Sequence, residues 1–291
     1  MAQRTSLFIT ELFLYAATVA VGIWVAFRHL TLKLPTVIQP IEPTPENILI
    51  FGVVLIGFTV LIVRTARLGG WSLHVAMALA VLVGAQYVAS GFLPPPWHTV
   101  FGAVLAVAPL LSRSQYARAW RFVSRFAPPL LLHNLAMVVA IAGVSALLGS
   151  SLTPNGAVIM LAALSVYDII AVYRTRHMVA IAERMMISGA VFGFLVPVRF
   201  SHLFDTGEQA GDMDRVMILG SGDIGLPLVL ASSVVSTSVP SAALIGAFSL
   251  AGLGLTHWLF MSQREAMPMA ALPPVAMMSI LGYLAAILIG L

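Results

Sequence analysis

The sequence has 291 residues, of which 60% are hydrophobic and only 9% charged, and its mean hydropathy is +1.00. A soluble domain is about 25% charged, so this composition excludes a water-soluble globular enzyme and a nucleic-acid-binding protein, although the net charge is +4. Cysteine is absent, which excludes disulfides, a thiol nucleophile and an iron–sulfur cluster held by thiolates.

Nine apolar runs follow one another along the chain, most of them close to the roughly 20 residues that a helix needs to cross a bilayer. They lie at about 7–27, 48–63, 72–92, 97–111, 127–149, 156–173, 216–238, 240–261 and 270–291. A tenth run, 185–198, is too short to span and is more typical of an interfacial or re-entrant segment. The sequence therefore predicts an all-α integral membrane protein with about nine transmembrane helices, surrounded by membrane lipids.

The basic residues between the runs predict the orientation. With nine spans and a cytoplasmic N-terminus, all but two of the 15 Lys and Arg residues fall on the inner face, and only Arg28 and Lys33 fall outside. This distribution follows the positive-inside rule. We therefore expect a multi-pass protein of the cell membrane whose C-terminus lies outside.

The longest hydrophilic stretch divides the chain into three parts of one membrane-embedded domain. Residues 1–175 form a six-span half, 176–215 a cytoplasmic loop with an apolar interfacial segment, and 216–291 a three-span half. Small residues at Gly282, Ala286 and Gly290 give the last run a face for close helix packing. Its neighbour is either a helix of the same chain or a second copy in a homo-oligomer.

Acidic residues inside apolar runs are candidates for chemistry, because a charge at the bilayer centre costs about 2.5–3.5 kcal/mol on insertion scales. Three of the 11 acids lie in such runs: Glu11, Asp168 and Asp223. Glu11 lies near the start of its run, and we expect its side chain to snorkel to the inner headgroups.

Asp168 and Asp223 are expected at matched depth on consecutive, antiparallel helices. Asp168 precedes Arg174 by six residues and Asp223 follows Arg215 by eight. At about 1.5 Å per residue, both carboxyls would lie roughly 9–12 Å below the same membrane face. This placement allows the two side chains to meet.

Two facing carboxyls in a medium of low dielectric constant cannot both ionise easily and tend to share a proton. Such a pair can act as a general base toward water and a general acid toward a peptide group, as in an aspartic protease. Helix–helix hydrogen bonds, or a proton relay in a transporter, would use the same residues. Spacing and depth leave these alternatives open.

The residues around Asp223 formally match a dinucleotide fingerprint, since Gly220–Gly225 reads G-x-G-x-x-G. No soluble βαβ unit precedes the motif, so we reject this interpretation. Gly220 and Gly222 instead allow close backbone approach to the carboxyl. The sequence contains no H-E-x-x-H and no G-x-S-x-G motif, and we expect neither a metal nor an organic cofactor.

These residues resemble the presenilin and signal peptide peptidase family of intramembrane aspartyl proteases. Tyr167-Asp168 matches the family's YD motif, and Gly220-Ser221-Gly222-Asp223 matches GxGD. The last run opens with Ala270-Ala271-Leu272-Pro273-Pro274, where the family has Pro-Ala-Leu, so Ala270 replaces the first proline. The nine spans and the long loop after the sixth are similar to presenilin.

The resemblance implies an aspartic endopeptidase in which Asp168 and Asp223 form the catalytic pair. Tyr167 would support the site, and Ala271, Leu272 and Pro273 would contact the substrate, the transmembrane helix of another protein. A helix must unwind before water can attack it, and its freed backbone could add as a strand to a protein edge near residues 199–217. The competing functions are a proton-coupled transporter or ion-leak pathway, and a prepilin-type GxGD leader peptidase.

Overall fold

A computed structural model describes residues 2–34, 71–111, 129–188, 191–197, 216–263 and 269–291, with isolated positions between 44 and 50. The second apolar run, 48–63, lies outside these residues. The described elements are α1 (Ala2–Thr31), α3 (Trp71–Ser90), α4 (Trp97–Leu111), α6 (Pro129–Ser150), α7 (Pro154–Ile169), the π-helical segment η1 (Ile170–Arg174), α8 (His177–Ser188), β1 (Gly193–Pro197), β2 (Val216–Gly220), α9 (Ser221–Val234), α10 (Val239–Met261) and α11 (Leu272–Leu288).

The helical membrane architecture expected from the sequence is confirmed. Five described segments are long and apolar enough to cross a membrane: Leu7–Thr31, Leu73–Ser90, Leu130–Ser150, Pro154–Arg174 and Val239–Met261. The apolar helices Trp97–Val107, Ser221–Val234 and Leu272–Leu288 are shorter. The number of spans and the orientation of the termini stay predictions.

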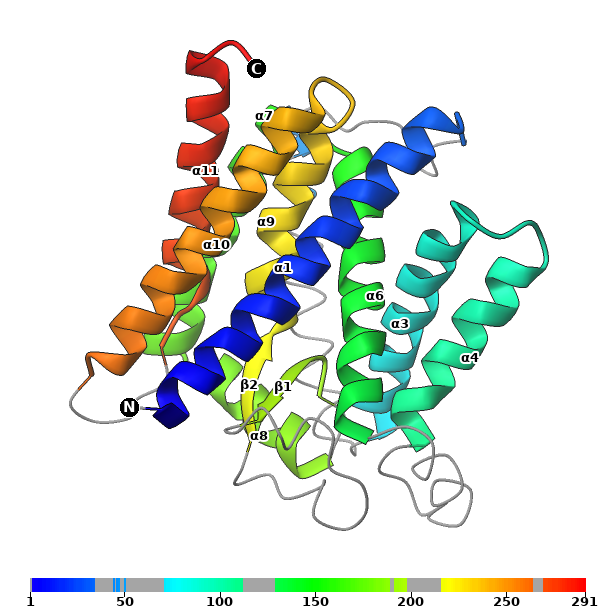
Figure 1. The fold of residues 1–291 in the computed structure, drawn as a ribbon. Coiled ribbons are helices and arrows are strands. Elements are labelled where there is room, and N and C mark those ends of the chain that lie inside the picture. Colours follow the sequence, from blue (N-terminus) through cyan, green and yellow to red (C-terminus); the bar gives the residue numbers. More distant parts are fainter. Residues whose placement is uncertain are drawn as a thin grey trace.

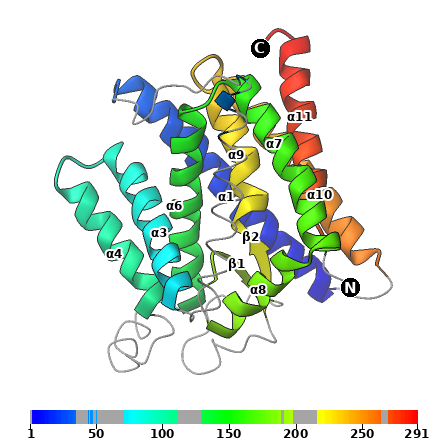
Figure 2. The same ribbon diagram turned by 180° about the vertical axis from the view of Figure 1, so that it is seen from behind.

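Helix α9 lies at the centre of the bundle. Helix α1 crosses it on one side (Figure 1), and α7 lies on the other side (Figure 2). Residues Leu228–Val234 of α9 are all buried, as expected for a helix that is apolar on every face. The helices α3 and α4 form one flank, and α10 and α11 pack on the opposite side (Figure 1).

Glycines allow the flanking helices to approach closely. A Cβ atom at Gly84 of α3 would lie 2.2 Å from the carbonyl oxygen of Ala140 in α6. The predicted small-residue face of α11 is partly internal, because a Cβ at Gly282 would lie 2.8 Å from Phe248 Cβ in α10, and Ala286 is buried. A Cβ at Gly290 would meet no atom within 4 Å.

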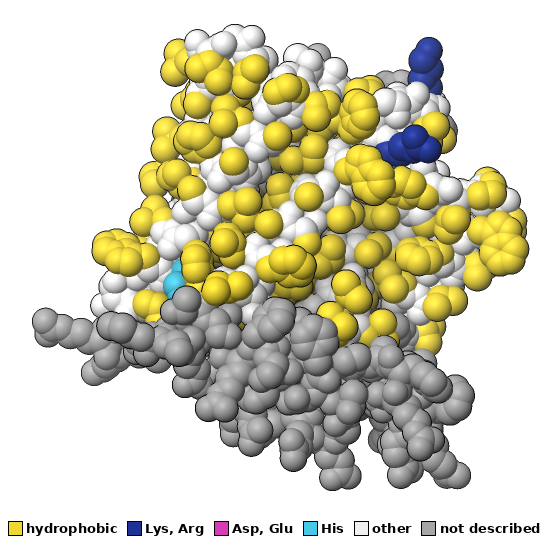
Figure 3. Space-filling model, in the orientation of Figure 1, with side chains coloured by type: hydrophobic (Ala, Val, Ile, Leu, Met, Phe, Trp, Pro, Cys, Tyr) yellow, Lys and Arg dark blue, Asp and Glu magenta, His cyan; other side chains and the backbone are white. Residues whose placement is uncertain are grey.

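Hydrophobic side chains cover the described part of the outer surface seen in Figure 3. On α1 these include Ile9, Phe13 and Trp24, each more than half exposed. Because exposed apolar surface is favourable in lipid, this face suits contact with acyl chains.

A two-stranded antiparallel sheet is the main departure from the predicted all-helical fold. Strand β1 pairs with β2 from Gly193↔Gly220 to Pro197↔Val216. The run 216–238 was predicted as one helix, which is wrong for its first five residues. A short apolar run does not distinguish strand from buried helix, and here pairing with β1 decides for strand.

The strand changes the depth estimate for Asp223. Five strand residues extend about 16 Å, whereas five helical residues extend about 8 Å. The predicted matched depth therefore rested on the wrong geometry. The tenth apolar run, 185–198, contains two different elements. It begins with the last residues of α8, which ends at Ser188, and it includes the buried strand Gly193–Pro197.

Candidate active site

Asp168 is the penultimate residue of α7, directly before the helix widens into η1. Local π-helical geometry is frequent at functional sites because it redirects side chains and loosens the backbone ladder. The half-buried Asp168 carboxyl faces the backbone N–H of Leu272. Its Oδ2 atom is buried and has no hydrogen-bond partner in the described part of the chain. The second oxygen is thus available to a further ligand.

Asp223 lies in the first turn of α9, which begins directly after β2. Gly220 caps this helix with extended backbone angles, φ −63° and ψ 139°. A negative charge is favourable near a helix N-terminus because the unpaired N–H groups point outward there. The strand-to-helix transition therefore presents the Asp223 carboxyl at the end of the sheet.

The two glycines before Asp223 have different surroundings. A Cβ atom at Gly220 would lie 2.9 Å from Asp223 Oδ2, closer than such atoms normally approach. A Cβ at Gly222 would meet no atom within 4 Å, and Gly222 is exposed. At Gly220, a side chain would collide with the Asp223 carboxyl, which explains why glycine is needed there. At Gly222, a side chain would have room, because that position borders open space.

Asp168 and Asp223 are brought together by the packing of α7 on α9. Their carboxyl groups are close enough to interact electrostatically. Two acids that meet between apolar helices form an arrangement that can share a proton and activate water.

The segment before α11 borders this carboxyl pair. Leu272, the first residue of α11, is buried and its N–H faces Asp168. The N–H of Ala270 donates to the Tyr173 hydroxyl at 3.4 Å, and the Thr256 hydroxyl donates to the Ala271 carbonyl at 3.4 Å. The prolines that follow Leu272 open α11, since they lie in its first turn, where N–H groups have no helical partner.

Tyr167 contacts the start of α8. Its hydroxyl lies 2.9 Å from His177 Nε2, and the two rings are tilted with centroids 5.7 Å apart. Tyr167 therefore connects α7 to α8 from the same helical turn that carries Asp168.

Sequence reasoning missed Tyr15, which α1 places beside the site. Tyr15 is fully buried, its hydroxyl donates to the backbone carbonyl of Asp223 at 3.4 Å, and it also interacts with Ser249. No sequence pattern marks Tyr15 as a residue of the site, in contrast to Tyr167 with its YD motif. Only the crossing of α1 over α9 shows its position.

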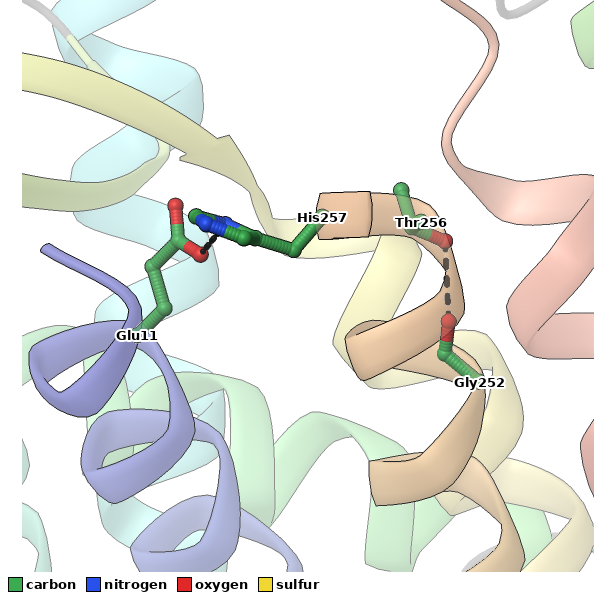
Figure 4. Close-up of polar contacts among 4 residues, drawn as sticks. All are labelled: Glu11, Gly252, Thr256 and His257. Atoms are coloured by element: carbon green, nitrogen blue, oxygen red, sulfur yellow. Dashed lines mark hydrogen bonds and ion pairs between the residues drawn. The ribbon is translucent and has the colours of Figure 1, made fainter. Parts of the chain in front are cut away.

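Glu11 does not snorkel, contrary to the prediction. Its side chain is buried, with the residue 1% exposed, and its Oε2 lies 2.9 Å from His257 Nδ1 on α10 (Figure 4). The prediction was wrong because Glu11 lies on the face of α1 that packs against α10. His257 thus makes a polar contact between α10 and α1. The preceding residue, Thr256, donates its hydroxyl to Gly252 O, one turn earlier in α10, at 3.0 Å (Figure 4).

The described residues include no group of three or more His, Asp or Glu side chains that could hold a metal ion.

A helical membrane bundle with two acids meeting between its helices defines the class of intramembrane aspartyl proteases. A sequence model of the family "signal-peptide peptidase, presenilin aspartyl protease" matches residues 10–290, and the chain belongs to this family. It is an aspartic endopeptidase that works within the membrane. This assignment confirms the predicted family and enzyme class.

Two solved structures have a similar fold. Both are described as a presenilin family intramembrane aspartate protease, one in space group C222 and one in P2. The first is 21% identical with a TM-score of 0.63, covering 97% of this chain and 99% of that chain. The second is 24% identical with a TM-score of 0.61, covering 96% of each. No curated protein sequence matches the chain.

Proposed function

We propose that Asp168 and Asp223 are the catalytic pair and that they hydrolyse peptide bonds in the transmembrane segments of other membrane proteins. The observation that carries the proposal is the packing of α7 on α9, which brings the two carboxyls within range of electrostatic interaction and leaves one oxygen of Asp168 without a partner among the described residues. That oxygen is free to receive the shared proton or to bind the attacking water.

The reaction needs one proton on the pair. The ionised carboxyl takes a proton from water as the water oxygen attacks the peptide carbonyl carbon, and the protonated carboxyl donates its proton to the carbonyl oxygen. The carboxyl that took the water proton then gives it to the amine nitrogen as the C–N bond breaks, and the other carboxylate takes a proton back from a hydroxyl of the intermediate, so the pair is again singly protonated. Because the proton belongs to the pair, assigning the base to Asp168 or to Asp223 describes two microstates of one system.

The sheet offers a binding edge for an unwound substrate. The N–H and C=O of Leu195 point away from β2, so Phe194 and Val196 are the residues of β1 that pair with it. On β2, the alternate residues Ile218 and Gly220 therefore direct their backbone groups to the other edge. No strand among the described residues pairs with this edge.

A substrate strand added along β2 would reach the carboxyl pair, because β2 ends at Gly220 and Asp223 follows three residues later. We expected such an edge near residues 199–217. Residues 199–215 of that range lie outside the described part, and Met217 lies on β2. The segment Ala271–Pro273 would line the opposite side of the bound strand. We retain a cytoplasmic N-terminus and an external C-terminus as part of this proposal.

The test uses purified protein in liposomes with a single-span substrate. We expect Asp168→Asn and Asp223→Asn each to abolish cleavage, while Glu11→Gln, the same acid-to-amide change away from the site, stays active. Circular dichroism of each variant checks folding. Cleavage by either aspartate variant would overturn the catalytic pair, and proton flux without cleavage would favour a transporter.

The binding edge needs its own experiment. Peptide substrates carrying one N-methyl group at successive positions lose one backbone donor each. Strand addition predicts that cleavage falls at every second position, because only alternate N–H groups face the edge. Equal sensitivity at all positions would contradict strand addition without affecting the catalytic pair.

A further inference from the structure

The outer edge of β1 is closed by a side chain of α6. Asn134 is fully buried, and its Nδ2 donates to the Leu195 carbonyl at 2.9 Å while its Oδ1 accepts from the Leu195 N–H at 2.9 Å. Beside it, His133 Nε2 lies 3.0 Å from the carbonyl oxygen of Gly193. Two successive residues of one helix thus bind two alternate residues of the strand.

The Asn134 side chain replaces a third strand. A carboxamide has one carbonyl and one N–H group in a plane, so its two bonds to Leu195 reproduce the paired hydrogen bonds between opposite residues of an antiparallel sheet. Buried backbone groups without partners cost free energy, and an open strand edge invites further pairing. Asn134 satisfies Leu195 and closes this edge in one contact.

The same contact decides which residues of β1 direct their backbone groups toward β2. Because Leu195 faces Asn134, the adjacent residues Phe194 and Val196 direct their backbone groups toward β2, where they pair with Leu219 and Met217. A slip of β1 by one residue would turn Leu195 toward β2 and leave the Asn134 amide unpaired in an apolar core. Asn134 therefore holds β1 in one position against α6, and β2 pairs with β1 in that position.

We propose that Asn134 is a positioning residue for proteolysis, which closes the β1 edge and fixes the sheet so that an extended substrate adds only along β2 in one register. This inference rests on the proposed binding of substrate to β2. Since β2 leads directly into the turn that carries Asp223, the register of the sheet selects the peptide bond that reaches the carboxyl pair.

The test compares the cleavage products of a single-span substrate by mass spectrometry. The variant Asn134→Leu keeps a similar volume and removes both hydrogen bonds to Leu195. We expect KM to rise about tenfold, as the loss of one or two hydrogen bonds predicts, with kcat within about twofold. We also expect new products displaced along the substrate, because a sheet released from α6 admits more than one register.

Two further variants separate positioning from a structural role. In Asn134→Asp, a protonated carboxyl still presents one donor and one acceptor to Leu195, so the wild-type product ratio should return. Ser151→Ala is the matched control, since Ser151 is a buried polar residue directly after α6 whose Oγ donates to Leu147 O of that helix and contacts no strand residue in the described part of the chain. Its product ratio should not change.

An unchanged product ratio in Asn134→Leu would overturn the proposal, and so would a loss of thermal stability with all products reduced equally. If Asn134→Leu does not fold, Asn134→Ala, which also removes both hydrogen bonds to Leu195, takes its place. Displaced products in Asn134→Ala then support positioning, and a wild-type product ratio opposes it. The aspartate variants decide the proposed function separately. Inactive Asp168→Asn and Asp223→Asn together with an unaltered Asn134→Leu product ratio would refute only the role of Asn134.

Discussion

The buried contact between Glu11 and His257 predicts a strong energetic coupling between α1 and α10. The contact can be removed from either side with Glu11→Leu or His257→Phe, and from both sides in the double variant. Phenylalanine at position 257 preserves the ring contact with Phe8, whose centroid lies 4.7 Å from that of His257. The three variants form a double-mutant cycle.

The two single variants should differ in cost. His257→Phe leaves Glu11 with no partner for either oxygen in the described part of the chain, since Oε1 already has none. The Glu11 side chain is 2% exposed, whereas that of His257 is 13% exposed and can reach water more easily. An unpaired buried polar group costs about 1–3 kcal/mol and a buried charge more. We therefore expect about 3 kcal/mol for His257→Phe and about 1–2 kcal/mol for Glu11→Leu.

The double variant should be close to wild type. When both partners are replaced by apolar groups of similar shape, no buried polar group is left without a partner. We expect its free energy of unfolding to fall by less than about 1 kcal/mol, which makes the coupling energy roughly 3–5 kcal/mol. This exceeds the average of about 0.6 kcal/mol for hydrogen bonds between membrane helices, because one partner is a nearly inaccessible acid.

The assay is reversible unfolding in mixed micelles with rising detergent denaturant, followed by circular dichroism. Four proteins are compared: the wild type, the two single variants and the double variant. If the single costs simply add in the double variant, the two side chains are not coupled and our account of the buried pair is wrong. A costlier Glu11→Leu than His257→Phe would contradict the argument from exposure.

Three further predictions follow from packing, capping and the carboxyl pair. Gly84→Ala should lower the free energy of unfolding by about 1–3 kcal/mol, since its Cβ would lie 2.2 Å from the Ala140 oxygen and would force α3 and α6 apart. Gly254→Ala is the control, because its Cβ would meet only Phe8 at 3.8 Å, and it should unfold no earlier than wild type. Thr153→Ala should cost about 1 kcal/mol, because the Thr153 hydroxyl accepts from the Gly156 N–H at the start of α7, and Thr153→Ser should restore the loss in the same unfolding assay. Activity against pH should be bell-shaped because only the singly protonated pair is competent, and a flat profile from about pH 4 to 9 would argue against a shared proton.

Local sequence was sufficient wherever the physical cause is local. Apolar runs of about 20 residues predict helices in lipid because the backbone must satisfy its hydrogen bonds within the segment. The motifs around Asp168 and Asp223 predicted the family and the enzyme class because acids within apolar runs are costly and therefore rare. These predictions needed no knowledge of which helices touch.

Other features depend on partners far away in the chain. The run that begins at Val216 is apolar in either conformation, and pairing with Gly193–Pro197 makes its first part a strand. Glu11 lies near the start of an apolar run, where a snorkelling side chain is expected. Instead it is buried and pairs with His257, which lies 246 positions later. Tyr15 and Asn134 carry no local signal, since the structure gives them partners more than 60 positions distant.

The sequence by itself determined that this chain lives in a membrane, folds mainly into helices and carries two acids suited to aspartyl proteolysis, since hydropathy and motif spacing are properties of short segments. Only the tertiary structure decided that a small sheet precedes Asp223, that Asn134 closes one edge of it and that Glu11 is paired inside the bundle. The physical reason is that a polar group in an apolar interior must find its hydrogen-bond partner in space, and its sequence neighbours do not reveal which residue that will be.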